Sequence, residues 1–299
     1  MSATLPVQDT GAEELAERPL RGWRALAAGV WADRNGRVGV VVVAVLVLAA
    51  IAGLSGLLPY SPTGQDPAVR MQGPSAAHWF GTDQFGRDIL VRTFVGVATS
   101  LRVAVVAVAL ACLIGSLLGV TGGFFRGWWD QIVGRLAEVL FAFPAILLAL
   151  AVVTALGRGW FNTAIAVAIV YTPIFVRVSR GPTLGVARSE YVRAGRVLGL
   201  PLPRLLFRHV LPGVAAPIVV QVTLALSWAI LTESALSFLG LGTQPPDPSL
   251  GLMVSDARNV VADAWWSMAF PAIAVVLAVV GLNLVGDGLR SALDPQERG

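Results

Sequence analysis

Long apolar runs dominate the chain and are separated by shorter polar segments. A helix needs about 20 mainly apolar residues to cross the hydrocarbon core of a bilayer. Six stretches meet this requirement, of which the fourth is the shortest. They lie at residues 38–58, 101–124, 132–156, 162–178, 213–239 and 268–285. The pattern therefore predicts an all-α integral membrane protein with about six transmembrane helices.

Composition supports the assignment to the membrane class. Of the 299 residues, 56% are hydrophobic and 13% are charged, and the mean hydropathy is +0.73. A typical soluble domain has about 25% charged residues, roughly twice the share found in this chain. All 22 basic residues are Arg. They cluster between the apolar runs, so the net charge of +4 indicates membrane topology and we expect no nucleic acid partner.

The positions of Arg predict the orientation of the chain in the membrane. Cytoplasmic loops of membrane proteins carry an excess of basic residues. With the N-terminus inside, most Arg residues fall in inner segments. The few that fall in outer segments are Arg70, Arg87, Arg92, Arg102, Arg158 and Arg258. We therefore expect both termini to lie in the cytoplasm.

The apolar runs divide the chain into predicted segments. Residues 1–37 lack the basic start and early apolar core of a cleaved signal peptide, so we expect a cytoplasmic tail that is retained. The first transmembrane helix is predicted at 38–58, followed by an extracytoplasmic loop at 59–96. The other spans lie within 97–288, and a second cytoplasmic tail is expected at 289–299.

Small residues recur at every fourth position of the second span. They are Ala107, Ala111, Gly115, Gly119 and Gly123. Such a ridge allows another helix to approach closely. We expect it to serve packing within the protein, with a role in lining a pathway as the alternative.

No metal-ligand cluster or nucleophile–base pair stands out in the sequence. The phosphate-binding loop G-x-x-x-x-G-K-[ST] requires Lys, which is absent. The only Cys, Cys112, lies in an apolar run, and the two His residues, His78 and His209, are far apart in the sequence. These residues form no disulfide framework or Cys-based metal site. We expect a chain that is not an enzyme by itself and binds no cofactor, so any ATP energy would arrive through partner chains.

Four polar residues stand out within or near the spans: Glu138, Gln221, Glu233 and Asn283. Polar groups in a membrane are costly and are functional candidates, although interhelical hydrogen bonds or helix-end positions also explain them. Glu138 is expected near the inner face and Glu233 near the outer face. Neither lies at the midplane, where a secondary transporter would keep a coupling carboxylate. A self-sufficient transporter or channel is therefore the less favoured alternative.

A basic segment at 179–212 separates the fourth and fifth spans and is too polar to cross a membrane. A helical pattern begins at Ser189. Its apolar face consists of Tyr191, Ala194, Val197 and Leu198. Gly199 is expected to end this helix, because Gly readily adopts the left-handed conformation at a helix end. Pro201 and Pro203 enforce the break.

A second short helix is expected after this break. Its apolar face consists of Leu205, Leu206, Val210 and Leu211, and Pro212-Gly213 is expected to stop it. A helix–turn–helix at the inner surface could lie on anionic lipid. It could also fit a groove on a cytoplasmic partner, with Arg at the rim. The sharp turn favours a protein partner, because lipid binding needs no fixed corner.

Four stretches resemble one family of membrane proteins. Arg193-Ala194-Gly195, Gly199 and Leu211-Pro212 resemble the cytoplasmic loop of ABC importer permeases, with its pattern E-A-A, three residues, G, nine residues, I-x-L-P. Three further stretches are HWFGTDQFGRDIL at 78–90, LSFLGLGTQPPDPSLG at 236–251 and NLVGDGLRSALDP at 283–295. Together they are similar to the second, C-type permease subunit of the dipeptide, oligopeptide and nickel family. Gly195 departs from the usual Ala, a change that costs about 1 kcal/mol in a helix.

The resemblance implies a type I ABC importer permease fold in the cytoplasmic membrane of a bacterium, in contact with membrane lipid. It implies pairing with a homologous second permease to form a pathway for short peptides. Nickel chelates, glutathione and opine-like compounds remain alternative solutes. Two ABC ATPase subunits, different or identical, would hydrolyse ATP-Mg below the membrane, and an extracytoplasmic solute-binding protein would deliver the solute.

The resemblance also assigns roles to two sets of residues. The loop at 179–212 would couple the ATPases to the spans through Glu190, Arg193, Ala194, Gly195, Gly199, Leu200, Pro201, Arg204, Leu211 and Pro212. The extracytoplasmic signature loop contains Gly81, Thr82, Asp83, Gly86, Arg87 and Asp88. In the second set the glycines suggest turns, and the three charged residues predict a local ion-pair set. This loop either stabilises the entry to the second span or contacts the binding protein and gates the pathway.

Overall fold

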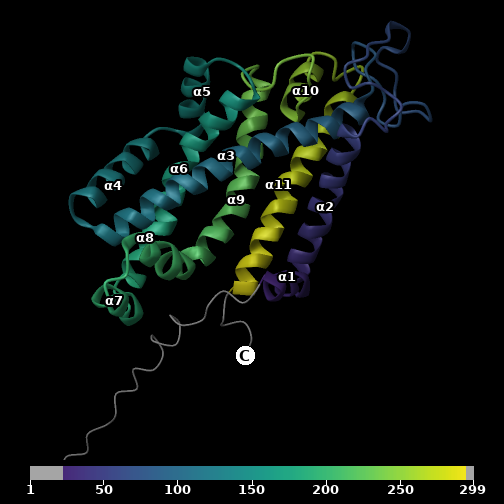
Figure 1. Ribbon diagram of the computed structural model, residues 1–299. Helices are drawn as coiled ribbons and strands as arrows, with labels where there is room; N and C mark the ends of the chain where they lie inside the picture. The colour runs from purple at the N-terminus through teal and green to yellow at the C-terminus, as the bar shows by residue number, and fades with distance from the viewer. Residues whose placement is uncertain (1–22, 294–299) are drawn as a thin grey trace, which may run out of the picture.

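The computed structural model describes residues 23–293, which form a bundle of helices without a β-strand (Figure 1). In chain order the elements are α1 (Trp23–Ala32), α2 (Arg34–Leu54), the 3₁₀ turn η2 (Pro67–Val69), α3 (Ile89–Phe125), α4 (Gly127–Phe141), α5 (Ala145–Leu156), α6 (Trp160–Val186), α7 (Glu190–Val197), α8 (Leu202–Leu205), the π turn η3 (Leu206–Val210), α9 (Leu211–Phe238), α10 (Leu250–Ala257) and α11 (Trp266–Leu293). The predicted all-α class is confirmed.

The described residues contain five helices that are long and apolar enough to cross a membrane, or six if the bent pair α4 and α5 counts as one span. The prediction of a single helix at 132–156 is wrong, because α4 and α5 meet at an angle of 95°. Pro144 precedes α5 and has an extended backbone. Proline cannot donate a backbone hydrogen bond, and it disfavours helix in the residue before it, so the helix breaks there.

Several helices extend beyond the predicted membrane boundaries. α3 begins at Ile89, so the end of the predicted outer loop 59–96 is helical. α6 continues to Val186, well into the predicted loop 179–212. α1 and the start of α2 lie within the predicted N-terminal tail, while residues 1–22 and 294–299 fall outside the described part of the chain. Hydropathy locates the membrane core but not the helix ends, since a helix can continue into water.

The small residues on α3 pack against α6. A Cβ atom on Gly115 would lie 2.5 Å from the Thr172 carbonyl oxygen, and one on Gly119 would lie 2.4 Å from the Val176 carbonyl oxygen. Ala107 is fully buried on the same helix. The predicted packing ridge is therefore confirmed, because only hydrogen fits between these backbones.

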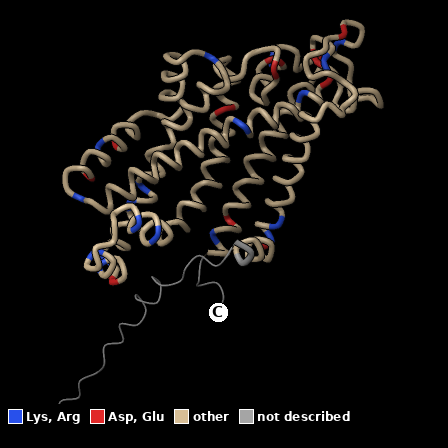
Figure 2. The backbone as a smooth tube through the Cα atoms, viewed as in Figure 1, with Lys and Arg blue, Asp and Glu red and all other residues tan. Residues whose placement is uncertain are grey.

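The two ends of the bundle differ in what they carry (Figure 1). One end holds α7 and α8, together with α1 and the end of α11. The other end holds α5, α10 and the long loop before α3. Basic residues gather around α7 and α8, while the middle of the bundle is nearly free of charge (Figure 2). This distribution agrees with α7 and α8 lying on the predicted cytoplasmic side.

α2 is attached to α11 through glycines on both helices. A Cβ atom on Gly39 would lie 2.6 Å from the Val285 backbone nitrogen and 2.8 Å from the Gly281 carbonyl oxygen. A Cβ atom on Gly288 would lie 2.6 Å from the Gly36 Cα atom. The two backbones are therefore in direct contact near the inner end.

Replacing Gly39 with Leu should destabilise the chain, because the added side chain meets backbone atoms that cannot move aside. Overpacking of this kind costs about 1–3 kcal/mol. Thermal unfolding of the purified chain in detergent should show a lower midpoint for Gly39→Leu. The matched control is Gly134→Leu, at a position with open space on α4. Equal midpoints for the two variants would contradict the close α2–α11 contact.

Candidate functional site

A sharp turn joins α7 to α8 at the inner end of the bundle. Gly199 has a φ of +70°, in the left-handed region. Its N–H donates to the carbonyl of Arg196 at 3.0 Å, and the N–H of Leu200 donates to the carbonyl of Gly195 at 3.0 Å. This pair of bonds is a Schellman motif, which satisfies carbonyls at a helix end. The predicted helix end at Gly199 is confirmed.

The predicted apolar face of α7 is largely exposed. Val197 is 89% exposed and Leu198 is 79% exposed, and Tyr191 and Ala194 are exposed as well. The opposite side of α7 contributes the fully buried Val192 to the core. Glu190 and Arg193 flank the exposed apolar side and are also exposed. Large apolar side chains that stay exposed together with charged neighbours mark an interaction surface.

Gly195 lies where α7 meets α8. A Cβ atom at this position would lie 2.9 Å from Leu205 Cδ1 and 3.2 Å from Leu200 Cδ1. Leu205 is almost fully buried. The two leucine side chains therefore occupy the space that an alanine methyl group would need, which gives a physical reason for Gly at this position.

The second part of the corner differs from the prediction. The helix continues from Leu202 to Phe238 without a stop at Pro212, so the predicted end at Pro212-Gly213 is wrong. The N–H of Leu211 donates to the carbonyl of Leu206, five residues back. Pro212 follows this π turn in the first turn of α9, where its missing N–H is tolerated. Pro201 and Arg204 are exposed at the corner.

The second predicted apolar face, unlike the first, packs into the protein. Val210 is fully buried, and Leu206 and Leu211 pack against the core. α7 is also attached to α3, because the Arg196 guanidinium lies 4.3 Å from the centre of the Phe124 ring. Such a cation–π contact holds the helix against the end of a span. The corner is thus buried on one side and exposed on the other.

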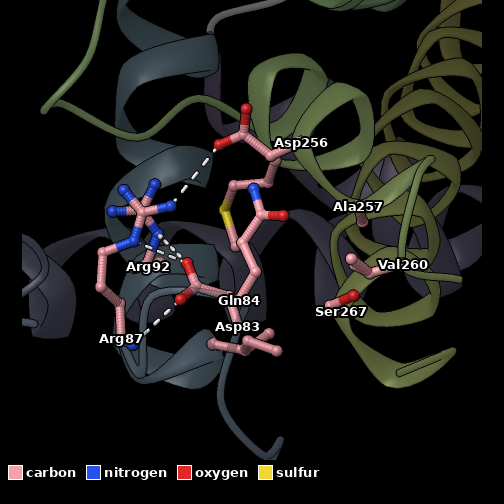
Figure 3. Close-up of a pocket in the computed structure, with 10 residues that line it drawn as sticks. Asp83, Gln84, Arg87, Arg92, Asp256, Ala257, Val260 and Ser267 are labelled. Carbon is pink, nitrogen blue, oxygen red and sulfur yellow. Dashed lines mark hydrogen bonds and ion pairs between the residues drawn. The ribbon is translucent and has the colours of Figure 1, made fainter. Parts of the chain in front are cut away.

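A network of charges organises the outer signature loop (Figure 3). The Asp83 carboxylate accepts a hydrogen bond from Arg87 Nε at 2.6 Å and lies 3.8 Å from Arg92 Nε. Arg87 also pairs with Asp256 on α10 at 3.5 Å. Arg92 is only 1% exposed and donates to the Pro62 carbonyl at 2.7 Å. The network therefore joins the loop to α3 and α10.

Asp88 does not belong to this network, in contrast to the predicted ion-pair set. One of its oxygens accepts from the Val91 N–H at 2.9 Å and caps α3. The other lies 2.8 Å from His78 Nδ1. The sequence pattern missed His78, Arg92 and Asp256 as members of the outer site. Asp256 is far away in the sequence, so no local spacing pointed to it.

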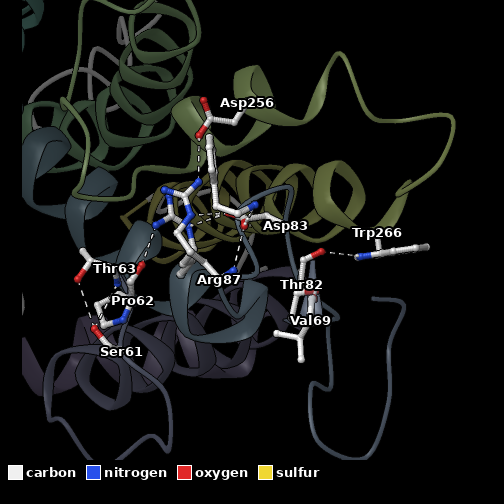
Figure 4. Close-up of polar contacts among 11 residues, drawn as sticks. Ser61, Pro62, Thr63, Val69, Thr82, Asp83, Arg87, Asp256 and Trp266 are labelled. Atoms are coloured by element: carbon white, nitrogen blue, oxygen red, sulfur yellow. Dashed lines mark hydrogen bonds and ion pairs between the residues drawn. The ribbon is translucent and has the colours of Figure 1, made fainter. Parts of the chain in front are cut away.

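The remaining signature residues shape the loop. Gly81 and Gly86 have φ angles of +75° and +73°. A Cβ atom at Gly86 would lie 1.8 Å from the Asp66 carbonyl oxygen, so no side chain fits there. The Trp266 indole at the start of α11 donates to the Thr82 carbonyl at 3.1 Å (Figure 4). The loop is therefore a folded cap over the outer ends of α3 and α11.

The cavity beside the charge network is small. It has a volume of about 20 Å³ and is bordered by Asp83, Arg87, Arg92 and Asp256 among others. A cavity of this size has room for about one water molecule. The network therefore acts through ion pairs and packing, and it does not form a binding pocket for an organic solute.

The structure shows which groups surround two of the predicted polar residues, Glu233 and Glu138. Glu233 is fully buried near the outer end of α9. Its carboxyl oxygens accept from Ser237 on the same helix at 2.6 Å and from Ser100 on α3 at 2.7 Å. Glu138 is exposed on α4. Glu233 thus makes an interhelical hydrogen bond, which was one of the explanations predicted for it.

Gln221 and Asn283 are half-buried and lie on α9 and α11, respectively.

The inner ends of the spans hold a different polar contact that the sequence pattern did not single out. Arg180 on α6 makes a two-pronged ion pair with Asp130 on α4, at 2.5 and 2.7 Å. This pair fixes the inner half of the bent span against α6.

Two carboxylates of the outer network should respond differently to substitution. Asp83→Asn leaves two buried guanidinium groups without their shared counter-charge, a loss that typically costs about 3–5 kcal/mol. Burial raises the pKa of Asp256, more than Arg87 and Arg92 lower it. The folded chain therefore binds the Asp256 proton more tightly than the unfolded chain does. Stability gains from this group as the pH falls through the raised pKa.

Thermal unfolding in detergent at pH 7 checks both expectations. Asp83→Asn should lower the midpoint strongly, whereas Asp256→Asn should change it little or raise it. The advantage of Asp256→Asn over the unchanged chain should shrink as the pH is lowered. A large loss of stability in Asp256→Asn at pH 7 would show that its ion pair with Arg87 outweighs its burial.

Comparison with known proteins agrees with this geometry. Residues 111–299 match the family described as binding-protein-dependent transport system inner membrane component. The dipeptide transport system permease protein DppC of Alkalihalophilus pseudofirmus is 42% identical over 92% of this chain and 90% of its own length. The glutathione transport system permease protein GsiD of Pectobacterium atrosepticum is 42% identical over 99% of this chain and 96% of its own length.

A third relative is the probable D,D-dipeptide transport system permease protein DdpC of Escherichia coli, which is 40% identical over 96% of this chain and 97% of its own length. The family match covers more than half of the chain, and the relatives align over almost all of it. The chain therefore belongs to the family of binding-protein-dependent inner membrane transport components, as a multi-pass ABC importer permease of the type I fold.

Proposed function

We propose that this chain is one of two permease subunits of an ABC importer that takes up short peptides across the cytoplasmic membrane. The observation that carries the proposal is the exposed apolar face of α7, held at a fixed corner on the inner side. A face that exposes Val197 and Leu198 to this degree requires a partner. The rigid turn at Gly199 suits a protein groove, into which an amphipathic helix fits by its apolar side.

The partner on α7 is an ABC ATPase subunit. The chain itself contains no Lys and so no phosphate-binding loop of the common type. Hydrolysis of ATP-Mg takes place in two ATPase subunits, while this chain is not catalytic and binds no cofactor. Exposed Arg193 and Arg204 lie beside the apolar face and the corner, where they can contact acidic groups at the rim of the groove.

The second permease covers the exposed apolar side of α4 and α5. Ile132, Leu136 and Val139 are exposed along α4, and Ile146 and Leu147 are exposed at the start of α5. The two helices meet at 95° and bury Val133, Ala149 and Val153 against the bundle, so their other sides stay exposed. A homologous permease on this side would enclose a pathway between the two chains.

The solute is a short peptide or a related small compound. Two of the relatives described above are named for dipeptides, and another at equal identity is named for glutathione, which is itself a small peptide. An extracytoplasmic solute-binding protein delivers the solute at the outer end, where the folded signature loop lies. Uptake of a labelled dipeptide, with unlabelled glutathione as competitor, would separate these two solutes.

Disrupting the apolar face of α7 should release the ATPases. The double substitution Val197→Asp with Leu198→Asp places two charges in the groove contact and should abolish co-purification of ATPase subunits in mild detergent. The matched control is Leu57→Asp with Val261→Asp, at exposed apolar positions in the outer loops, which should leave ATPase recovery unchanged. Unchanged recovery of ATPases with the first variant would contradict docking on α7.

The turn at Gly199 should be needed to transfer movement from the ATPases to the spans. Gly199→Val forces a β-branched residue into the left-handed region, which it rarely adopts. The corner should distort, so uptake should fall at least about tenfold while ATP hydrolysis and membrane insertion persist. Parallel assays of uptake and hydrolysis in liposomes measure this. Wild-type uptake at normal expression would count against the assignment of the corner as a coupling element.

A further inference from the structure

Tyr191 spans the corner between α7 and the base of α9. Its hydroxyl donates to the carbonyl of His209 at 3.4 Å. The same hydroxyl lies against Gly213, where an added Cβ atom would be 3.4 Å away. Gly213 lies in the first turn of α9. Among the described residues, this is the only side-chain hydrogen bond from α7 to the helix that follows the corner.

The acceptor lies within the π turn. In η3 the N–H of Leu211 bonds five residues back, so the helix changes its hydrogen-bond register just before Pro212. His209 Nδ1 lies 3.3 Å from the carbonyl of Arg204, across the same turn. A change of register is a place where a helix can rotate or bend at low cost, and π turns occur often at functional sites. Tyr191 is thus bonded to the deformable part of the long helix.

Two other contacts join α7 to α3 and to the corner. Arg196 contacts Phe124 at the end of α3. Gly195 contacts Leu200 and Leu205 in the corner. Arg196 holds α7 through a cation–π contact and Gly195 holds it through apolar packing, and neither contact reaches α9. The hydrogen bond from Tyr191 constrains the orientation of its partners as well as their distance, because it is strong only near its preferred geometry.

We propose that Tyr191 is a positioning residue, whose hydrogen bond to His209 transfers the movement of α7 to α9 through the π turn. The inference rests on the proposed function, since it takes α7 as the site where the ATPases dock. Tyr191 is 41% exposed on the side of α7 that carries Ala194 and Leu198, and its hydroxyl reaches the base of α9. The residue therefore links the partner surface to a span directly.

Tyr191→Phe tests the proposal, because it removes the hydroxyl and keeps the ring. The complete importer, with its second permease, ATPases and binding protein, is reconstituted in liposomes, and both uptake of a dipeptide and ATP hydrolysis are measured. Uptake per ATP should fall roughly threefold, as expected for the loss of one neutral hydrogen bond. Co-purification of the ATPases should stay unchanged, because the apolar face is intact.

The matched control is Tyr60→Phe, which removes a hydroxyl that also donates to a backbone carbonyl, that of Ala77 at 3.1 Å in the outer loop. This control should leave uptake per ATP unchanged. Wild-type uptake per ATP in Tyr191→Phe would overturn the proposal. Loss of ATPase binding in Tyr191→Phe would also overturn it, since the hydroxyl would then act in docking.

Failure of the proposed function would look different. If Val197→Asp with Leu198→Asp still retained the ATPases, docking on α7 would be wrong, and the proposal for Tyr191 would fall with it. If that variant lost the ATPases while Tyr191→Phe kept wild-type uptake per ATP, only the role of Tyr191 would be wrong. The two variants together therefore distinguish the two failures.

Discussion

Close contact between helix backbones is the constraint on which the membrane part of this structure depends. Lipid tails are about as apolar as leucine, so the hydrophobic effect does little to bring membrane helices together, and van der Waals packing must hold them. Gly115 and Gly119 allow α3 to approach α6, and Gly36 and Gly39 allow α2 to approach α11. The positions of these glycines therefore determine which spans can lie in direct contact.

Polar groups hold together the two ends of the bundle, where the chain leaves the membrane. At the outer end, Asp83 joins the signature loop to Arg92 on α3. At the inner end, the pair of Asp130 and Arg180 joins α4 to α6. The two sites differ in burial, because Arg92 is almost fully buried while Arg180 is partly exposed. Only the outer network therefore carries the large cost of losing a counter-charge.

Features that depend on local chemistry could be predicted from the sequence. The apolar runs indicated the spans, and Gly199 indicated the end of α7. The bend before Pro144 could not be predicted from hydropathy, because hydropathy carries no direction, although α4 holds Asp130, Arg135 and Glu138 and is less apolar than α5. Pro212 suggested a helix end that does not occur, because it follows the change of hydrogen-bond register at η3 and lies in the first turn of α9, where proline is tolerated. Asp256 joins the outer network only through the fold.

α9 connects the two ends that these groups organise. It has 28 residues and is therefore about 42 Å long. Its outer end is fixed by Glu233, which bonds Ser100 on α3, and by the Ser234 carbonyl, which lies so close to Gly251 on α10 that no Cβ fits between them. Its inner end begins at a π turn. A helix that is rigidly packed at one end and deformable at the other converts a small displacement of its base into a tilt. Movement of α7 would thus reach the outer cap through α9.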